Sequence, residues 1–287
     1  MISKSILTAI ILLLLYETFT RVSGRHGLDT SQNDKSANLI SVQDFIYNYP
    51  QRDIAVDTVI VGTSVSRKLI TDSLGGHYIN LAFNAWSTYD GLQLVKLSRK
   101  KPACLLVEMN YVKSQVLQPE ITNSLEPISY YSGKMLKSLQ LRNQPVGLMV
   151  GEIKNSNKAR MDELKKKKRD NTELYKLNLR MNIEKMNQLI PDSILDKRFT
   201  VLKLLIDGFK KQDIGVVFFE VPFDEELEHT ASVLQTRKYF YRYFPPTSFK
   251  YVSIPTVNNY VYSDGVHLSL ESALDYTLYL KSELNKN

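Results

Sequence analysis

Cysteine is nearly absent from this chain of 287 residues, which contains only Cys104. A lone cysteine excludes an internal disulfide, and it leaves the redox compartment open. Because Cys104 lies in an apolar run with the composition of a strand, we interpret it as a small core residue. The sequence also lacks zinc-finger spacing, an RNA-binding aromatic signature and any internal repeat. A nucleic-acid partner is therefore not expected.

The excess of positive charge is concentrated in one region of the chain. The formal net charge is +7, and the excess lies between residues 154 and 169, with an unbroken basic run at 165–169. Such a run is typical of a solvated helix face or a mobile loop, which we prefer to a site for an anionic partner. The length suits one large domain with a sizeable core, or one domain with extra elements.

The first 22 residues contain the one long hydrophobic run. Lys4 precedes an apolar stretch at 6–16, which has the length of a signal peptide and is short for a membrane span. Residues 22–24 are a poor cleavage site. We prefer an uncleaved anchor, because Glu17 and Arg21 can lie at the membrane interface. The alternative of a buried helix is less favoured, since this helix has no polar face.

These features predict the cellular location of the protein and the role of its N-terminal residues. We expect residues 1–20 to be a membrane anchor or signal segment and residues 21–52 to be a linker. The rest of the chain is expected outside the cytoplasm, in the periplasm or at the cell surface. The alternative is a soluble intracellular protein, which the shortness of the apolar run supports.

Short apolar runs alternate with segments of helical periodicity, which predicts βαβ units and a parallel sheet. We expect a three-layer α/β/α, flavodoxin-like domain at 53–287, with a helical insertion at about 113–198. The insertion either packs on the sheet, which we prefer, or serves as a partner-binding arm. The expected strands are 56–61, 78–83, 103–110, 214–222 and 251–254, and the expected helices include 39–49, 89–99, 161–189, 199–211 and 270–284.

Polar side chains follow the predicted strands at the places where those strands end. Ser64, Asn84 and Asn110 come at or just past three different strands, and His267 lies in the loop before the closing helix. The carboxyl ends of parallel strands share one edge, where ligands bind. Ser64 is also expected at a tight turn before an amphipathic helix, whose N-terminus favours developing negative charge.

These residue types suit nucleophilic catalysis. A serine hydroxyl needs a base, and His267 can remove the proton of Ser64 near neutral pH. The histidine needs an acceptor on its other ring nitrogen, and Asp264 lies three residues earlier in the same loop. An Asp-x-x-His loop is also compatible with half of a metal site, but no further ligand cluster accompanies it. The remaining histidines are interpreted as surface residues: His26, His77 and His229.

An acyl-transfer site also needs donors for the oxyanion. The candidates are the Ser64 backbone N–H, the Asn110 side-chain amide, and either Asn84 or the Ala85 N–H. Ser66 competes as nucleophile but lies one step into the expected helix. A separate aromatic and basic cluster at 239–246 is interpreted either as a sugar-binding surface or as core packing.

Several motifs together resemble the SGNH (GDSL-like) hydrolase superfamily. They are Gly62-Thr63-Ser64, Asn84-Ala85 after a strand, Asn110 at a strand end, and Asp264-Gly265-Val266-His267. The resemblance implies Ser64 as nucleophile, His267 as base and Asp264 as its orienting partner, with Asn110 as the oxyanion asparagine. Two positions depart from the family pattern: Thr63 replaces the usual aspartate, and Asn84 or Ala85 stands at the second-block glycine.

The N-terminal helix resembles that of membrane-anchored bacterial members of this superfamily. Some of these take part in O-acylation of cell-envelope polysaccharides beside a membrane-bound O-acyltransferase. The resemblance thus implies a serine esterase or O-acyl(acetyl)transferase that acts on a carbohydrate or acyl ester and needs no cofactor or metal. The alternatives are a catalytically silent scaffold subunit of a surface-polysaccharide assembly, and a soluble esterase or lipase.

Overall fold

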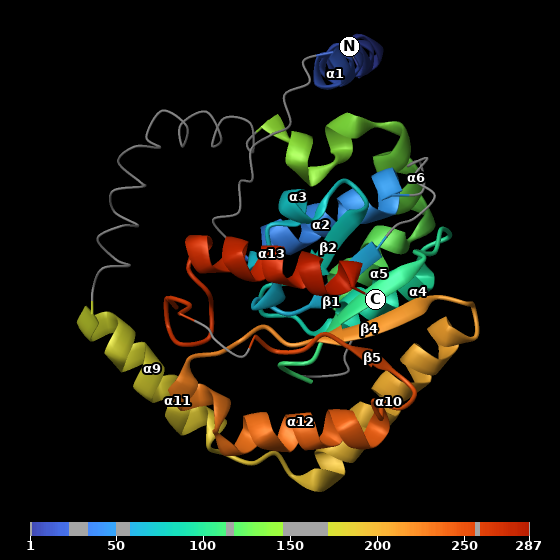
Figure 1. Cartoon of the computed structure of the whole chain (residues 1–287). Coiled ribbons are helices and arrows are strands. Elements are labelled where there is room, and N and C mark those ends of the chain that lie inside the picture. The colour runs from blue at the N-terminus through green and yellow to red at the C-terminus, as the bar shows by residue number, and fades with distance from the viewer. Residues whose placement is uncertain are drawn as a thin grey trace. The chain divides into compact units, whose positions relative to one another are not determined.

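The computed structural model describes residues 2–22, 34–49, 58–112, 118–145, 172–255 and 259–286 (Figure 1). The basic run at 165–169 lies outside these residues. The chain divides into two compact units. The first combines Met1–Arg52 with Pro119–Leu164, and the second combines Asp53–Gln118 with Lys165–Asn287.

The second unit is built on a five-stranded sheet whose strands are all parallel. Its strand order is β2-β1-β3-β4-β5. The strands are β1 Thr58–Gly62, β2 Tyr78–Ala82, β3 Cys104–Glu108, β4 Gly215–Phe219 and β5 Lys250–Tyr251. This confirms the predicted α/β class and parallel sheet, and each strand lies within or next to its predicted range. Parallel pairing brings the carboxyl ends of the strands to one edge.

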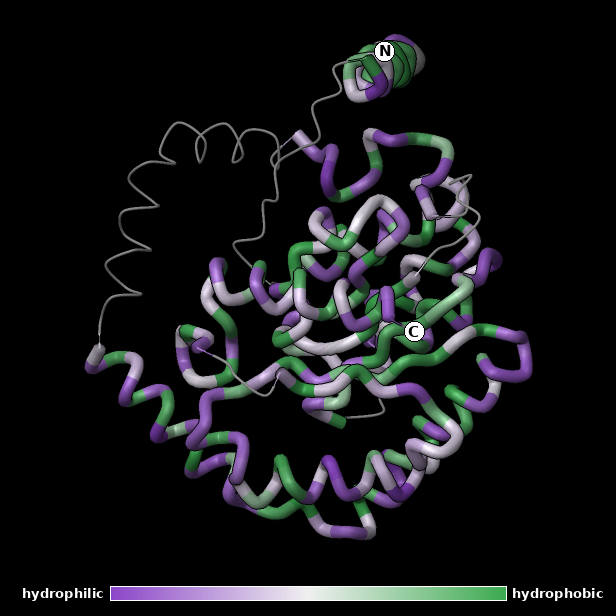
Figure 2. The backbone as a smooth tube through the Cα atoms, in the orientation of Figure 1, coloured by the Kyte–Doolittle hydropathy of each residue, from purple (hydrophilic) through white to green (hydrophobic). Residues whose placement is uncertain are grey.

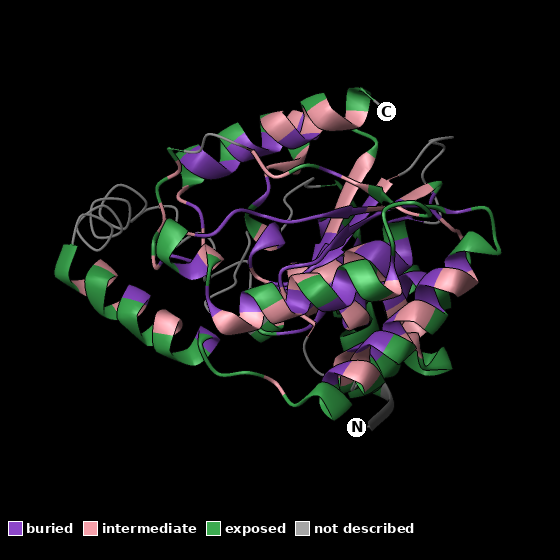
Figure 3. Ribbon diagram, turned by 60° about the horizontal axis from the view of Figure 1, so that its bottom comes forward, coloured by how far each residue is buried: buried purple, intermediate pink, exposed green. Residues whose placement is uncertain are grey.

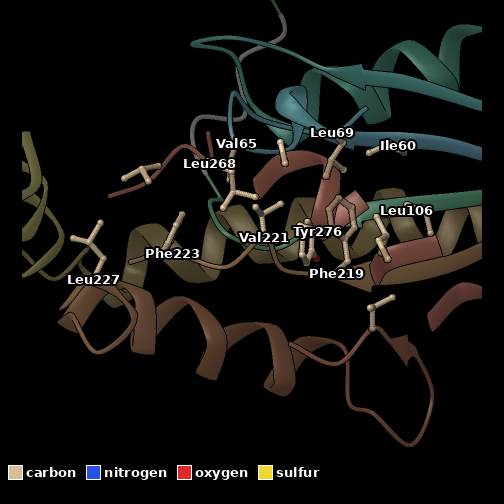
Figure 4. Packing of buried hydrophobic residues seen from close by; sticks show 14 of the residues in the cluster. Ile60, Val65, Leu69, Leu106, Phe219, Val221, Phe223, Leu227, Leu268 and Tyr276 are labelled. Carbon is tan, nitrogen blue, oxygen red and sulfur yellow. The ribbon is translucent and has the colours of Figure 1, made fainter. Parts of the chain in front are cut away.

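Helices cover both faces of this sheet. Because side chains alternate between faces along a strand, Ile60, Leu106 and Phe219 share one face. They belong to one core cluster with Tyr276 of α13 (Leu270–Asn285) (Figure 4). Phe218 points to the other face, where its ring lies 5.6 Å from that of Phe240 in α12 (Ala231–Tyr243). The central strands β1 and β3 are buried between these layers (Figure 3).

The helices of the second unit follow the predicted alternation. They are η2 Ser66–Lys68, α3 Thr71–Leu74, α4 Thr88–Leu97, α9 Thr172–Met186, α10 Asp192–Lys210, α11 Glu225–Glu228, α12 Ala231–Tyr243 and α13 Leu270–Asn285. The closing helix α13 begins as predicted: the Ser269 hydroxyl accepts a hydrogen bond from the Ser272 N–H at 3.2 Å.

Three rings of the aromatic and basic cluster at 239–246 pack in the core. Most of it belongs to α12, in which Tyr239 and Phe240 are buried. The Phe199 ring lies 5.4 Å from Tyr239 and 5.0 Å from Phe240. Phe244 is also buried, and its ring lies 4.8 Å from Phe218 of β4. These three rings are therefore buried, whereas Tyr241 of the same cluster is exposed.

The amphipathic helix predicted after Ser64 is not formed. The chain makes only the three-residue 3₁₀-helix η2 and the four-residue α3. The N–H of Ser66 is taken by the Glu108 carboxylate at 3.2 Å, and that of Ile70 by the Thr277 hydroxyl at 3.1 Å. The Ile70 N–H is thereby withdrawn from a continuous helical ladder, whereas the Ser66 N–H, at the start of η2, has no acceptor within a helix in any case. The helix-dipole argument for Ser64 therefore fails.

The described residues of the first unit form mainly helices. They are α1 Ile2–Val22, α2 Asp34–Asn48, α5 Pro119–Leu125, α6 Pro127–Met135, η3 Lys137–Leu139 and η4 Leu141–Asn143. Helix α2 confirms the helix predicted at 39–49, which lies in the stretch expected to be a linker. The expected insertion is divided, because α5 to η4 group with the N-terminal helices whereas α9 belongs to the second unit. Within α1, Lys4–Val22 is long and apolar enough to cross a membrane (Figure 2).

Candidate active site

Ser64, His267 and Asp264 are joined by hydrogen bonds in that order. The Ser64 hydroxyl lies 2.9 Å from His267 Nε2, and His267 Nδ1 lies 2.8 Å from Asp264 Oδ2. Ser64 is two residues past β1, and the other two residues lie in the loop before α13. All three side chains are partly exposed. Residues far apart in the chain thus form the arrangement that a base-activated serine requires.

The loop at 263–268 holds the histidine through its own backbone. Asp264 Oδ1 accepts hydrogen bonds from the N–H groups of Val266 at 3.0 Å and His267 at 2.8 Å. Gly265 has a φ of +83°, a conformation that favours glycine. The Asn182 amide donates to the Asp264 carbonyl at 2.9 Å, so α9 supports the loop from outside. The orientation of His267 is therefore built in locally.

The Asp264 carboxyl is stabilised in its ionised form. Burial alone would raise its pKa, but the ring of His267 and the two backbone N–H donors outweigh burial and lower the pKa below its ordinary value. At neutral pH Asp264 is thus an acceptor that selects the His267 tautomer with a proton on Nδ1. That tautomer leaves Nε2 free to accept the Ser64 proton.

Glu108 holds the turn that carries Ser64, a role that the sequence reasoning missed. Its Oε1 accepts from the Thr63 hydroxyl at 2.7 Å, and its Oε2 accepts from the backbone N–H of Thr63 at 2.7 Å and of Ser66 at 3.2 Å. The Ser66 hydroxyl also donates to Oε2. Glu108 is fully buried. The available signal was an acidic residue at the end of an apolar strand.

We call these hydrogen bonds of Glu108 the Glu108 clamp. The clamp distinguishes the two candidate nucleophiles, Ser64 and Ser66. Ser66 is fully buried and its hydroxyl is bound to Glu108, whereas Ser64 is partly exposed and bound to His267. The clamp also requires Gly62, because a Cβ there would overlap Ser66 Oγ and the Glu108 carboxylate. Thr63 takes part through its hydroxyl and N–H. Thr63 thus has a structural partner here.

The oxyanion candidates each lie two residues past the end of a different strand. Gly62 pairs with Ala82, and Val61 pairs with Val107. Counting on from these pairs places Ser64, Asn84 and Asn110 at one level beyond the sheet. Adjacent strands lie about 4.8 Å apart, so these residues leave the sheet side by side.

Asn110 is engaged with the backbone. Its amide nitrogen donates to the Val221 carbonyl at 2.7 Å, and its oxygen accepts from the Val221 N–H at 2.9 Å. The side chain is buried. Its two hydrogen bonds to Val221 link the segment after β3 to the segment after β4. One amide hydrogen remains for any oxyanion role. The geometry favours a structural function for Asn110.

Ala85 has backbone strain that a glycine would relieve. Its φ is +60°, which a residue with a Cβ rarely adopts and which costs of order 1 kcal/mol. Ala85 is exposed, beside the partly exposed Asn84. Within the part of the chain that the structure describes, no acceptor takes the N–H of Ala85 or of Ser64. These two N–H groups are the better oxyanion donors.

A buried ion pair supports the same sheet edge. Glu220 follows β4, and its carboxylate accepts from Arg237 Nε at 2.9 Å and Nη2 at 2.6 Å. Glu228 binds the same guanidinium. Burial raises the pKa of Glu220, although Arg237 opposes that rise. The Tyr276 hydroxyl donates to the Glu220 carbonyl at 2.8 Å, which links α13 to β4.

The fold and site define an α/β protein with a Ser–His–Asp arrangement at the carboxyl edge of a parallel sheet. Among the described residues, no group of three or more His, Cys, Asp or Glu side chains is placed to hold a metal ion. In comparisons with protein-family models and with curated proteins, no match to this chain was found.

Proposed function

We propose that the protein is a serine-dependent acyl ester hydrolase or O-acyltransferase of the SGNH type. The observation that carries the proposal is the hydrogen-bonded series from Ser64 through His267 to Asp264. The site also offers two uncommitted backbone N–H groups at adjacent strand ends. A reaction of this class needs a nucleophile, a base, an orienting carboxylate and oxyanion donors.

The first half-reaction forms an acyl-enzyme. Ser64 Oγ attacks the ester carbonyl carbon while its proton passes to His267 Nε2, and the carbonyl oxygen becomes an oxyanion. The N–H groups of Ser64 and Ala85 are the proposed donors to that oxyanion. When the intermediate collapses, the ester C–O bond breaks and the leaving alkoxide takes the proton from His267. Asp264 stabilises the transient imidazolium.

The second half-reaction decides between hydrolase and transferase. Water or a carbohydrate hydroxyl loses its proton to His267 and attacks the acyl carbon, and Ser64 is released with that proton. Both outcomes use the same residues. The resemblance to the anchored SGNH proteins favours a carbohydrate or cell-envelope polysaccharide as acceptor, and a membrane-bound O-acyltransferase as partner.

We also propose that α1 anchors the protein to a membrane, with the active-site domain on the extracytoplasmic side. The length and composition of Lys4–Val22 support an anchor. Fractionation of cells tests this placement: full-length protein recovered in the cytosol would contradict it.

One observation favours a second candidate function. The commitment of the Asn110 amide to Val221 weakens the expected oxyanion hole. A catalytically silent subunit that serves as a scaffold in a surface-polysaccharide assembly would retain the fold and lack turnover.

A fluorophosphonate probe distinguishes the two. We expect the wild-type chain to be labelled at Ser64, Ser64→Ala to be unlabelled, and Ser193→Ala, which removes an exposed serine of α10, to behave as wild type. Absence of label on the wild type, or equal label on Ser64→Ala, would exclude the enzyme. Acetyl and longer-chain esters, offered with and without a sugar acceptor, then define the acyl group and separate transfer from hydrolysis.

A further inference from the structure

The end of the apolar helix α1 is bound into the first unit by polar contacts. The Glu17 carboxylate is buried and accepts from the backbone N–H of Lys137 at 3.0 Å and of Ser138 at 2.8 Å. Arg21 donates to Glu17 at 2.6 Å and to the Met135 carbonyl at 2.6 Å. The start of η3 is therefore fastened to the last two turns of α1.

Because of this attachment, the depth of α1 in a membrane also sets the depth of η3. The span Lys4–Val22 has 19 residues, a length of about 28 Å. A hydrocarbon core is about 30 Å thick, so a crossing needs nearly the whole helix. Glu17 is then about 8 Å from the helix end. The Tyr16 hydroxyl, one residue earlier, donates to the Asn143 carbonyl. Residues 135–143 are thereby held within about 8 Å of the lipid–water boundary, the depth at which interfacial helices lie.

An uncovered apolar face lies beside this attachment. Ile128, Tyr131 and Met135 are spaced three and four residues apart, so they share one face of α6. Their exposed fractions are 85%, 53% and 69%, and that of Leu139 in η3 is 45%. Met135 is also the residue whose carbonyl binds Arg21. The face is therefore continuous with the polar end of the apolar helix.

Another side of α6 packs on α2. Gly133 is buried where a Cβ would overlap the Tyr47 ring, and the Tyr47 hydroxyl donates to the Ser129 carbonyl at 3.2 Å. The apolar face thus points away from a side that is already occupied. Lys134 and Lys137 are exposed and lie within and just after this segment. An apolar face accompanied by lysines matches the boundary between acyl chains and anionic headgroups.

We propose that the exposed face of α6 and η3 rests in the headgroup region of an anionic phospholipid bilayer, in the leaflet from which the C-terminal end of α1 emerges. This second contact fixes the first unit against the membrane surface. It rests on the proposed anchoring by α1, and it is independent of the ester chemistry at Ser64.

The test measures the depth of single labels on the full chain. In a Cys104→Ala background, one cysteine is placed at Ile128, Tyr131, Leu12 or Thr122 and coupled to a nitrobenzoxadiazole fluorophore. Each protein is reconstituted in vesicles of phosphatidylcholine and phosphatidylglycerol with brominated acyl chains. Leu12 reports the anchor, and Thr122 is the matched control, an exposed polar position on α5.

We expect bromine quenching at Leu12, Ile128 and Tyr131 to exceed that at Thr122 several-fold. Quenching at Leu12 without quenching at Ile128 and Tyr131 would overturn the docking and leave the anchor intact. Weak quenching at all positions would overturn both. If the label at Ile128 is shielded from water in detergent and is not quenched by the brominated lipid, a protein partner covers this face. That result would also overturn the proposal. Fluorophosphonate labelling of the same samples reports Ser64 separately.

Discussion

Replacement of Glu108 should destabilise the turn that carries Ser64. The loss of unfolding free energy should depend on how many of the hydrogen bonds to Glu108 the new side chain can keep. In Glu108→Ala the buried N–H groups of Thr63 and Ser66 lose their acceptor. Each orphaned buried donor costs about 1–3 kcal/mol, so the expected loss of unfolding free energy is roughly 2–6 kcal/mol. The two hydroxyls can rotate to other partners and add less. A loss of that size is a large part of a domain's stability of about 5–15 kcal/mol.

Glu108→Gln should be much milder. The amide can place its oxygen at the Oε2 position, where it retains both backbone donors, and its NH₂ group then faces the Thr63 hydroxyl, which can turn and accept. Only the charge assistance is lost, and the expected cost is about 1–2 kcal/mol. Because the turn keeps its shape, the rate of fluorophosphonate labelling should change little. In Glu108→Ala displacement of Ser64 should slow labelling by up to about 100-fold.

Denaturant unfolding followed by tryptophan fluorescence measures these differences. Trp86 is the single tryptophan of the chain, and it is buried against Phe83 in the same unit. Glu225→Gln, at an exposed position on α11, is the matched control. The order of stability should be control, then glutamine, then alanine. Equal stability of the alanine and control variants, or equal damage by glutamine and alanine, would refute the clamp.

Three other substitutions test neighbouring parts of the site. Gly62→Ala should cost about 1–3 kcal/mol in denaturant unfolding, because its Cβ must displace the Glu108 carboxylate; wild-type stability would contradict the close packing. Asp264→Asn should lower kcat for an activated ester by roughly 10⁴-fold, since the wrong tautomer of the histidine is held. The carboxyl pKa is lowered on folding, so the extra stability of wild type over Asp264→Asn should be present above about pH 4 and lost as the pH falls further. Arg237→Leu should cost about 3–5 kcal/mol by leaving Glu220 buried without its cation, and stability should partly return at lower pH as Glu220 takes up a proton. An Arg237→Leu protein whose stability falls with pH as wild type does would show that Glu220 is not the cause.

Much of the candidate site was predictable because its signals are local. Asp264 and His267 are three residues apart in one loop, and their mutual contacts need only that loop and a glycine. Ser64 follows an apolar run that predicts a buried strand, and parallel strands place their carboxyl ends together. The order and type of these residues therefore indicated a hydrogen-bonded series that the structure contains.

The supporting groups were not predictable, because their contacts join segments that are distant in the chain. Glu108 reaches Thr63 and Ser66 across 45 and 42 residues, and only the pairing of β1 with β3 brings them together. Asn110 meets Val221 across 111 residues, which turned an expected oxyanion donor toward the backbone. The helix after Ser64 is short for a similar reason, because the Ile70 N–H binds the Thr277 hydroxyl, 207 residues away.

The sequence by itself determined the parallel α/β core, the apolar N-terminal helix and the residues at the carboxyl edge of the sheet. Each depends on the periodicity and spacing of nearby residues, which backbone geometry converts directly into local structure. Only the tertiary structure decided that Ser66 is held by Glu108, that Ala85 carries a positive φ, and that residues 119–143 join the N-terminal helices. These outcomes depend on which buried polar groups meet, and a buried donor or acceptor takes whatever partner the packed chain provides.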